Sequence, residues 1–537
     1  MKAPCELDVD EARLDAVSRR LEQRCLEPED YELLKVVINT VGYLRRVIME
    51  KGHSIQRLLR MIFGAHTEKT DSVVPGRTPP GGHAHPVTTR KKKRKGHGRR
   101  GVGAYWGAGT ACVSHQRLAP GDVCPDCGKG KLFDTARPAV LLRLVAQPPI
   151  AGTVFKLQKL RCALCGKIHG ATPPPEAGAE KVAPNVAVML AILRYGYGLP
   201  MNRIEQMQED YGVPLPAGTQ WELIREHARE LAPILQEYER QAASGEVLHN
   251  DDTTARILEL EKHIRQTRAE ATAGEKPRTG IFTTGIIAQC KQHMIALFKS
   301  GRQHAGENLQ DVLNNRPNNL PPPIQMSDGL SRNKPASTST IQANCNAHGR
   351  RGFVAIADDF PQECTRVLET MRQVYAFDAH ARRNALSDEQ RLLFHQKHSA
   401  PLLNGPDGLK PWLESLFNSR QVEPNSSMGK AINYVLKRWN KLTLFLSHPG
   451  APLDNNIAER ILKTAIRHRN NSLFYRTQNG AHVGDLFMSL IVTCRMARVN
   501  PFDYLSTLRR FSQRLRDGPS QWMPWNYKTT AAALSGN

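Results

Sequence analysis

The sequence predicts a multidomain α+β protein, and three observations support that prediction. The chain has 537 residues, which is too long for a single hydrophobic core. Segments whose apolar residues recur at helical spacing alternate along it with short apolar runs typical of β-strands. Two Cys-x-x-Cys pairs indicate a small module held together by a metal ion. We therefore expect helical regions, one metal-binding module and an α/β core.

The charge balance indicates a polyanionic partner. Lys and Arg number 74 against 51 Asp and Glu, which gives a formal net charge of +23 and a pI of about 9.7. Such an excess attracts phosphates, so double-stranded DNA is expected, although a merely basic surface would give the same balance. No apolar run approaches the ~18 residues of a membrane span, the N-terminus does not resemble a secretory signal, and the cysteines suggest no disulfide framework. We expect a cytoplasmic protein without a membrane partner.

Residues 1–65 are expected to form an N-terminal helical segment. Between Leu34 and Ile62 the apolar residues recur at alternating steps of three and four, with one interruption. This heptad pattern favours a coiled coil, which would dimerise the protein. Gly42 and Gly52 weaken a long helix, and a single amphipathic helix packed on its own domain is the alternative.

Residues 66–105 are expected to form a basic, disordered linker or arm. Eight of the eleven residues from Arg90 to Arg100 are Lys or Arg. Like charges at this density repel one another, so the block cannot form a core, but it should bind phosphates whatever their sequence. A solubilising linker is the alternative. The candidate DNA-binding residues of the arm are Arg90, Lys91, Lys92, Lys93, Arg94 and Lys95.

Residues 106–175 are expected to form a zinc-binding module. The two pairs are Cys124 with Cys127 and Cys162 with Cys165, and a glycine follows each pair. Four thiolates on two tight turns complete the closed tetrahedral shell of one structural Zn²⁺. The gap between the pairs is long, but two strand-like runs within it could form a β-hairpin that joins them. Unrelated buried cysteines are the alternative.

Residues 176–242 return to a helical pattern. Breaks are expected at 198–200 and 212–216, where Gly and Pro interrupt the periodicity. Short helices joined by tight turns are typical of a helix-turn-helix that binds DNA, and a helical adaptor without DNA contacts fits equally well.

An RNase H-like α/β catalytic core is expected in two parts, residues 243–352 and 451–512. The first part predicts three strands, a helix and a fourth strand, which is how an RNase H-like core begins. A charged loop is expected at 262–277, between the first two strands. Residues 353–450 are expected to form a helical insertion, and residues 513–537 a polar tail.

Three acidic residues are candidates for catalysis. Asp251 and Asp328 stand where strand-like runs end, and Glu459 stands at the start of a predicted helix. Carboxylates in this order can converge to bind two divalent cations that act on a phosphodiester. Each acid has a structural alternative, because Asp caps strand ends readily and Glu459 would complete a capping box with Asn456. Asp252 follows Asp251 but should face the other side of the strand, and Asp251 is preferred.

Two basic residues of the same predicted helix are candidate DNA contacts. Lys463 and Arg467 follow Glu459 at four and eight residues, which places all three on one helix face. A carboxylate flanked by cations suits a metal ligand beside DNA phosphates.

The phrase CNAHGRRGF, at residues 345–353, supplies further candidates. Arg350 and Arg351 could bind phosphate, or could be surface residues at a helix N-terminus. Cys345 and His348 have the spacing of metal ligands, but no second pair follows, so zinc is not expected there.

These phrases together resemble the insertion sequence 66 family of transposases, members of the DDE superfamily. The shared landmarks are an aspartate followed by an acid and Thr at 251–253, Asp-Gly at 328–329, the CNAHGRRGF phrase, and DNNIAER at 454–460. The chain departs from the family pattern at Asn346, where an aromatic residue is usual, and at 469–474, where a Lys and a Trp are missing.

The resemblance implies a DNA transposase that binds terminal inverted repeats and catalyses strand cleavage and strand transfer. It implies that Asp251, Asp328 and Glu459 hold two Mg²⁺ (or Mn²⁺) ions per active site, in addition to one structural Zn²⁺. The implied partners are double-stranded DNA (element ends and target), further copies of the chain in a homodimer or larger synaptic complex, and accessory proteins of the same element. The implied location is the bacterial cytoplasm, at the nucleoid. The alternatives are an inactive or domesticated transposase that only binds DNA, and an RNase H-type nuclease without strand transfer.

Overall fold

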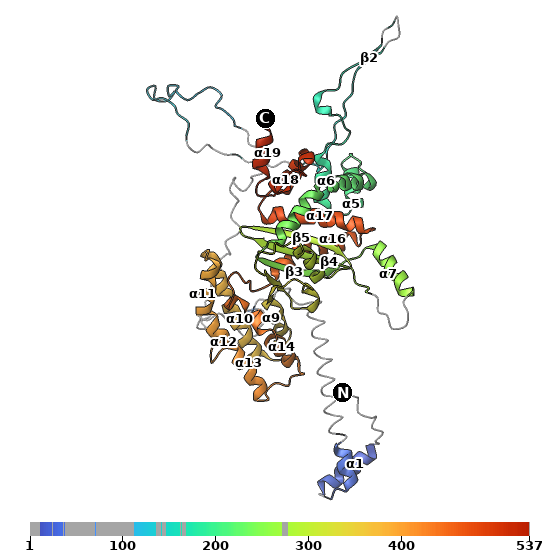
Figure 1. The fold of residues 1–537 in the computed structure, drawn as a ribbon, viewed down its shortest axis with the longest axis vertical. Coiled ribbons are helices and arrows are strands. Elements are labelled where there is room, and N and C mark those ends of the chain that lie inside the picture. The colour runs from blue at the N-terminus through green and yellow to red at the C-terminus, as the bar shows by residue number, and fades with distance from the viewer. Residues whose placement is uncertain are drawn as a thin grey trace. The chain divides into compact units, whose positions relative to one another are not determined.

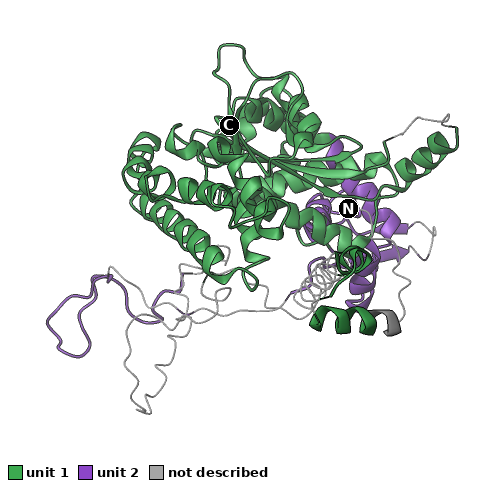
Figure 2. Ribbon diagram, turned by 90° about the horizontal axis from the view of Figure 1, so that it is seen from below, with its two compact units in different colours: residues 1–77, 195–198, 230–537 green, residues 78–194, 199–229 purple. Residues whose placement is uncertain are grey.

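The computed structural model of the chain contains many helices and one five-stranded sheet (Figure 1). It describes residues 11–23, 25–35, 37, 70, 112–135, 141, 147–161, 163, 168–270 and 278–535. Two compact units are present (Figure 2): unit 1 comprises residues 1–77, 195–198 and 230–537, and unit 2 comprises residues 78–194 and 199–229. Most of the heptad series, the arm residues Arg90 to Lys95, and Cys162 and Cys165 lie outside the described residues.

The described part of the N-terminal segment is helical, as predicted. Helix α1 spans Glu11–Glu22, and a second helical stretch covers residues 28–35. Arg20 joins them through two hydrogen bonds to the buried Asp30 carboxylate, at 2.7 and 2.8 Å. Dimerisation through the heptad series stays a prediction.

Unit 2 contains a short hairpin at another place than the predicted one, whose first strand-like run, at 139–145, lies almost entirely outside the described residues. Strand β1, Lys159–Arg161, pairs antiparallel with β2, Ile168–Gly170, so the hairpin flanks the second Cys-x-x-Cys pair and does not join the two pairs. Residues 153–158, expected as part of a longer strand, carry no strand. Every residue of β1 and β2 is exposed, so no buried face stabilises a longer pairing.

Residues 175–243 are helical, with breaks where they were predicted. The elements are η2 Pro175–Ala177, α4 Asn185–Ala191, a π-helical stretch η3 Ile192–Gly196, α5 Met201–Asp210 and α6 Ala217–Ala243. Gly198 and Gly212 adopt positive φ values of 77° and 71°, a conformation that glycine reaches without steric cost. These two residues therefore fix the ends of the helical stretches.

Unit 1 is built on a mixed sheet with the strand order β5-β4-β3-β6-β7. The strands are β3 Val247–Thr254, β4 Phe282–Cys290, β5 His293–Gly301, β6 Ile324–Ser327 and β7 Ile341–Asn344, and helix α8 Ala305–Leu313 follows β5. Strands β3, β4 and β5 form an antiparallel meander, whereas β6 runs parallel to β3 and β7 parallel to β6. The predicted order of three strands, a helix and a fourth strand is confirmed, and β7 adds a fifth.

Helices cover both faces of this sheet. On one face Gly285 of β4 lies so close to helix α16, Asn456–Ser472, that a Cβ atom there would be 3.0 Å from Leu462 Cδ2. On the other face Asn308 of α8 donates a hydrogen bond to Thr284 Oγ1, at 2.8 Å. Neighbouring strand residues thus face different helices.

Helix α17, Gln478–Met496, covers the free edge of β5. Three polar side chains spaced four residues apart accept hydrogen bonds from alternate backbone N–H groups of that strand. The pairs are Ala296 N with Thr493 Oγ1 (3.0 Å), Phe298 N with Ser489 Oγ (2.9 Å) and Ser300 N with Asp485 Oδ2 (2.7 Å). An unpaired strand edge would invite intermolecular pairing, and this arrangement closes it.

The segment between β3 and β4 is a helix and not the predicted loop. Helix α7 spans Leu258–Glu270, and residues 271–277 lie outside the described part. Its sequence consists largely of good helix formers, but Ile264 is its one buried residue, so the apolar periodicity that identifies amphipathic helices is almost absent. The expectation of a loop was therefore wrong for residues 262–270, and it stays a prediction for residues 271–277.

The segment between the two parts of the core is helical, as predicted. Its elements are α9 Asn346–Val354, α10 Pro361–Arg383, α11 Asp388–His398, α12 Ala400–Asn404, α13 Leu409–Asn418, α14 Ser427–Leu436, α15 Trp439–Leu442 and η5 Leu444–Leu446. The helices from α10 to α14 gather in one group (Figure 1) around an apolar core. Buried Asp378 joins α10 to α11 through an ion pair with Arg391, at 2.7 Å.

The C-terminal residues are folded, so the prediction of a polar tail was wrong. The elements are α18 Pro501–Arg510, η6 Ser512–Arg514, η7 Pro519–Trp522 and α19 Tyr527–Ser535. Trp522, Met523 and Tyr527 are buried, and Tyr504 donates a hydrogen bond to the Trp522 carbonyl, at 2.8 Å. These apolar residues are few but large, which is enough to anchor a short segment. Among the described helices, none has the length and apolar character that a membrane span requires.

Candidate active site

Asp251 and Asp252 face opposite sides of strand β3. In the register with β4, Asp251 lies on the face that carries α16, and Asp252 on the face that carries α8. The Asp252 side chain is buried and contacts His304 Nδ1 at 3.3 Å and Arg332 Nη2 at 3.1 Å. Asp252 is therefore held by cationic or polar partners, whereas Asp251 points toward the helix that carries Glu459. Asp251 does not end its strand as expected, because β3 continues to Thr254.

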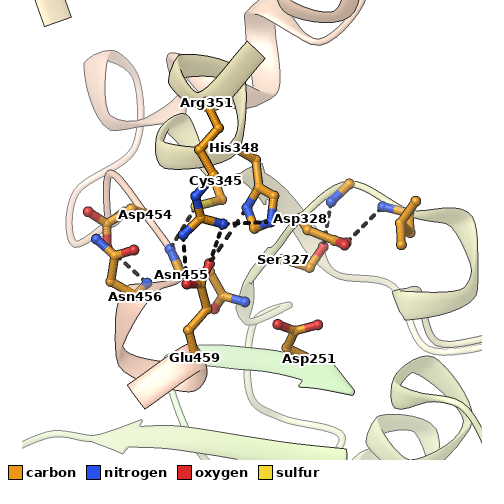
Figure 3. Close-up of polar contacts among 12 residues, drawn as sticks. Asp251, Ser327, Asp328, Cys345, His348, Arg351, Asp454, Asn455, Asn456 and Glu459 are labelled. Carbon is orange, nitrogen blue, oxygen red and sulfur yellow. Dashed lines mark hydrogen bonds and ion pairs between the residues drawn. The ribbon is translucent and has the colours of Figure 1, made fainter. Parts of the chain in front are cut away.

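Asp251 is a carboxylate surrounded by negative charge. Its Oδ1 accepts a hydrogen bond from the Asp252 backbone N–H, at 2.8 Å, and among the described residues no cation forms an ion pair with it. Burial raises the pKa of Asp251 to about 7, and the charges of Asp328, Asp252 and Glu459 contribute to the increase. Figure 3 shows the Asp251 carboxylate facing the space between Asp328 and Glu459. A divalent cation bound beside Asp251 would offset the negative charge around this side chain.

Asp328 follows directly after β6 and fixes the turn there. Its Oδ1 accepts hydrogen bonds from the Asn333 side chain at 2.6 Å and from the Leu330 N–H at 3.0 Å. The next residue, Gly329, has a φ of 85°, which favours glycine. Tyr434 of α14 donates to the Asp328 carbonyl at 3.0 Å. Asp328 Oδ1 thus stabilises the turn after β6, which was the structural alternative to a catalytic role. The other carboxylate oxygen, Oδ2, can still bind a ligand.

Glu459 does not form the capping box that was its structural alternative. Helix α16 begins at Asn456 with Asn455 as its N-cap, and no side chain caps it. The Glu459 carboxylate forms an ion pair with Arg351, whose Nη2 and Nη1 lie 2.9 and 3.3 Å from Oε2 and Oε1. Glu459 therefore contributes negative charge to the cluster while its oxygens face the CNAHGRRGF helix, α9.

Asn455 joins the three segments that form the site, and it was not among the residues predicted for the site. Its backbone N–H donates to Cys345 Sγ at 3.2 Å, and its side-chain N–H donates to the Asn250 carbonyl at 3.1 Å. Its Oδ1 lies 3.1 Å from His249 Nδ1. Burial lowers the pKa of His249 to about 4, so this histidine is neutral and its Nδ1–H donates to Asn455. The paired asparagines of DNNIAER were the available signal.

The candidate DNA-binding cations are distributed differently from the expectation. Arg351 is paired with Glu459, and Arg350 donates a long hydrogen bond of 3.4 Å to Thr70. Lys463 and Arg467 are exposed on α16, and eight helical residues after Glu459 correspond to about 12 Å along the axis. The DNA-binding roles of these four residues stay predictions.

The C-terminal end of α16 is fixed to the end of β3 by an arginine. Arg469 donates hydrogen bonds to Thr253 Oγ1 at 3.1 Å and Thr254 Oγ1 at 2.8 Å. Together with Asn455 at the other end, it sets the position of the helix that carries Glu459.

The CNAHGRRGF phrase brings two metal-ligating side chains close to Glu459. The expectation that zinc is not bound there stays a prediction. One ligand atom each of Cys345, His348 and Glu459 lies within 4.8 Å of the others. The sequence supplied only two of the three, because Glu459 is more than a hundred residues away.

The first Cys-x-x-Cys pair adopts a tight turn. Cys124 N donates to the Gly130 carbonyl at 2.7 Å, and Gly128 N donates to the Cys124 carbonyl at 2.9 Å. Backbone hydrogen bonds to the sulfur from Lys129 and Gly130 lower the pKa of Cys127, which favours the thiolate that binds metal. Because the second pair lies outside the described residues, the four-cysteine zinc site stays a prediction.

A family model described as "Transposase IS66 family" matches residues 181–483, which is more than half of the chain. The match contains Asp251, Asp328, the CNAHGRRGF phrase and Glu459, and it excludes both Cys-x-x-Cys pairs.

The chain is also similar to three proteins of Sinorhizobium fredii (strain NBRC 101917 / NGR234). It is 25% identical to "Uncharacterized protein y4hP" over 441 residues, which cover 78% of this chain and 75% of the relative. It is 25% identical to "Uncharacterized protein y4jD" over 365 residues, covering 64% of this chain and 66% of that protein. It is 26% identical to "Uncharacterized protein y4qI" over 356 residues, covering 64% and 62%.

Proposed function

This chain belongs to the IS66 family of transposases, and we propose that it binds the terminal inverted repeats of an insertion sequence and catalyses metal-dependent DNA strand cleavage and strand transfer. The family implies DNA as the partner, and the net charge of +23 is consistent with a protein that neutralises phosphates. The polypeptide would act in the cytoplasm, at the nucleoid.

The strand order supports an RNase H-like core. An antiparallel meander of β3, β4 and β5 is followed by a helix and two parallel strands on the other side of β3. In this arrangement β3 lies centrally, so a side chain on it can meet one from the end of its parallel neighbour, β6. Asp251 and Asp328 occupy those two positions.

The observation that carries the proposal is the electrostatic environment of Asp251. Burial is the main cause of its raised pKa, and the charges of Asp328 and Glu459 add to the increase, although the three acids come from strand β3, the end of strand β6 and helix α16. Three carboxylates so close would repel one another, and they are tolerated together where a cation binds. Their convergence therefore favours a catalytic role over three independent structural ones.

Asp251, Asp328 and Glu459 would hold two Mg²⁺ or Mn²⁺ ions. When bound, such a pair supplies Lewis-acid activation of the attacking hydroxyl and stabilisation of the leaving oxygen in a phosphodiester displacement. The chain itself fixes the acids: Asn333 orients Asp328, and Asn455 orients the start of α16. Arg351 would release Glu459 when a cation replaces its guanidinium, and its guanidinium would then turn to a DNA phosphate.

The other predicted parts would hold the DNA and assemble the complex. Cys124, Cys127, Cys162 and Cys165 would bind one structural Zn²⁺, and the helices at 176–242 and the arm at 90–100 would contact the element ends. Cleaving two ends and joining them to one target requires a homodimer or a larger synaptic complex. Accessory proteins of the same element are further candidate partners.

A second candidate function is DNA binding without catalysis. It is favoured by one observation, the ion pair in which the Glu459 carboxylate is already neutralised by Arg351. In that case the chain would be an inactive or domesticated transposase.

A strand-transfer assay separates these functions. The full chain is incubated with Mg²⁺ and DNA carrying both ends of the element that encodes it, and cleaved and joined products are measured. The wild type should give both products. Asp328→Asn should give neither while binding the DNA equally well, and Asp407→Asn, an exposed acid of the helical insertion, should behave as wild type. Binding without any product would establish the second function, and cleavage without joining would indicate a nuclease.

A further inference from the structure

Cys345 and His348, which the two-cation mechanism does not use, form a cluster with Glu459, which it does use. Cys345 is the N-cap of α9, His348 lies one turn further along that helix, and Glu459 lies in the first turn of α16. One ligand atom of each lies within 4.8 Å of those of the other two. A tetrahedral zinc site has ligand-to-ligand distances of about 3.3–3.6 Å, so small side-chain rotations would close the cluster around an ion.

Two of the ligand atoms are already oriented for such a site. His348 Nδ1 is buried without a hydrogen-bond partner and lies 3.8 Å from Glu459 Oε1. Cys345 is fully buried, and Asn455 N–H donates to its sulfur at 3.2 Å. A buried imidazole nitrogen without a partner is costly unless a ligand satisfies it. The hydrogen bond from Asn455 fixes the sulfur in the way that residues around a metal site fix its ligands.

We propose that Cys345, His348 and Glu459 form a binding site for a thiophilic divalent cation, best Zn²⁺, which is distinct from the Mg²⁺ site and shares Glu459 with it. Sulfur and imidazole ligands select Zn²⁺ over Mg²⁺, which prefers oxygen. Three protein ligands leave the fourth position to water, in contrast to the closed four-cysteine site predicted near the N-terminus. On binding, the thiol proton of Cys345 passes to solvent and the sulfur–metal bond replaces the S–H bond.

Arg351 holds the cluster in its present form. Its Nη1 lies 3.3 Å from Glu459 Oε1 and 3.4 Å from His348 Nε2, so it contacts the side of the imidazole opposite to Nδ1. Its side chain is 40% exposed, so it can turn toward solvent when a cation takes over the charge of Glu459.

The proposal has a functional consequence that rests on the proposed transposase activity. Because Glu459 would serve both sites, Zn²⁺ bound to Cys345 and His348 would hold this carboxylate on the α9 side. Zn²⁺ should then inhibit Mg²⁺-dependent cleavage, and the site would act as a trap that keeps the enzyme inactive while zinc is bound.

Counting bound zinc tests the site without any DNA. The full chain is loaded with Zn²⁺ in the presence of excess Mg²⁺, freed of unbound metal by gel filtration and analysed by elemental mass spectrometry. Cys345→Ser and His348→Gln should each hold one zinc fewer than the wild type. Cys364→Ser, which changes another fully buried cysteine of unit 1, should match the wild type. Equal zinc content in all four proteins would overturn the proposal.

Two further measurements keep the test decisive. In the Co²⁺-loaded protein, the sulfur-to-cobalt absorption should decrease in Cys345→Ser and stay unchanged in Cys364→Ser. His348 is 29% exposed, so His348→Gln should fold even if a change at buried Cys345 does not. In the cleavage assay, added Zn²⁺ should reduce the rate of the wild type by a larger factor than that of His348→Gln. If the wild type never cleaves DNA but Cys345→Ser and His348→Gln each still hold one zinc fewer, the proposed activity is refuted. The zinc site is then supported independently of that activity.

Discussion

Half-buried Asp251 on β3 and fully buried Asp485 on α17 are both acids whose pKa is raised to about 7, yet their surroundings differ. Burial is the main cause of the increase at both positions. At the sealed edge of the sheet, Asp485 accepts two hydrogen bonds of 2.7 Å from Ser300, which favour its ionised form. At the candidate active site, Asp251 accepts one hydrogen bond and has Asp328 and Glu459 as neighbours.

Because these two acids share a raised pKa but differ in their neighbours, a shifted pKa alone does not identify a functional site. Asp485 has hydrogen-bond donors within the fold, whereas the negative charges around Asp251 oppose its ionisation. A bound cation would stabilise the ionised form of Asp251. The sign of the neighbouring charges therefore separates a structural acid from a candidate metal ligand.

The largest expected effect is on strand cleavage. Asp251→Asn should reduce Mg²⁺-dependent cleavage to background, because a neutral amide oxygen is a weak ligand for a divalent cation. Asp485→Asn should keep measurable cleavage, because an amide oxygen can still accept the Ser300 N–H bond. A folded Asp251→Asn variant with an undiminished rate would break the comparison.

The next effect is on stability as a function of pH. The pKa of Asp251 is about 7 in the folded chain and near the ordinary 3.8 when unfolded, so from pH 3.8 to 7 only the unfolded state loses its proton. This acid therefore reduces stability as the pH rises through that window, by up to about 4 kcal/mol above it. In thermal unfolding without divalent cations, Asp251→Asn should exceed the wild type in stability at pH 8 and match it at pH 4.

Mg²⁺ provides the control for that pH effect. Added at pH 8, it should stabilise the wild type and not Asp251→Asn, because only the carboxylate gains a counter-charge. Equal stabilisation of the two proteins would place the cation elsewhere.

The sequence predicted the strands that carry Asp251 and precede Asp328 because the signals for strands are local. Apolar runs identified the strands, and Asp251 and Asp328 stand next to such runs. The capping box of Asn456 and Glu459, the structural alternative to a catalytic Glu459, was also a local signal. The helix starts one residue earlier than that arrangement requires, with Asn455 as the cap.

What the sequence could not supply are contacts between distant segments. The ion pair of Arg351 with Glu459 joins residues 108 positions apart, and no spacing rule encodes it. Asn455 contacts both Asn250 and Cys345, from two other segments. Helix α7 was missed for a different reason: it has a single buried residue, so helix propensity and not periodicity was the informative signal.

A smaller effect is expected from the packing of α16 on the sheet. Gly285→Ala would place a Cβ 3.0 Å from Leu462, next to the helix that carries Glu459, and should cost about 1–3 kcal/mol. It should also slow cleavage, since the helix must move. Gly301→Ala, at the end of the sealed strand β5, meets only the flexible end of Gln478 at 3.4 Å and should be neutral. Chemical denaturation measures the change in stability, and the cleavage assay measures the change in rate. An equal decrease in Gly285→Ala and Gly301→Ala would show that the contact with α16 is no more sensitive to packing than the β5 edge of the sheet.

The smallest effect is expected from an exposed cation beside the acids. Lys463 lies one helical turn after Glu459 and should contact one DNA phosphate. The control is Lys528 on α19, next to the segment whose Trp525 stacks on His293 of β5. Each phosphate contact contributes about 0.9 to the slope of log affinity against log salt. Lys463→Ala should therefore lower that slope by about 0.9 in a binding titration, and Lys528→Ala should leave it unchanged. An equal decrease of the slope in both variants would mean that basic residues all over the chain attract DNA without specific contacts. The DNA would then not be bound preferentially beside the three acids.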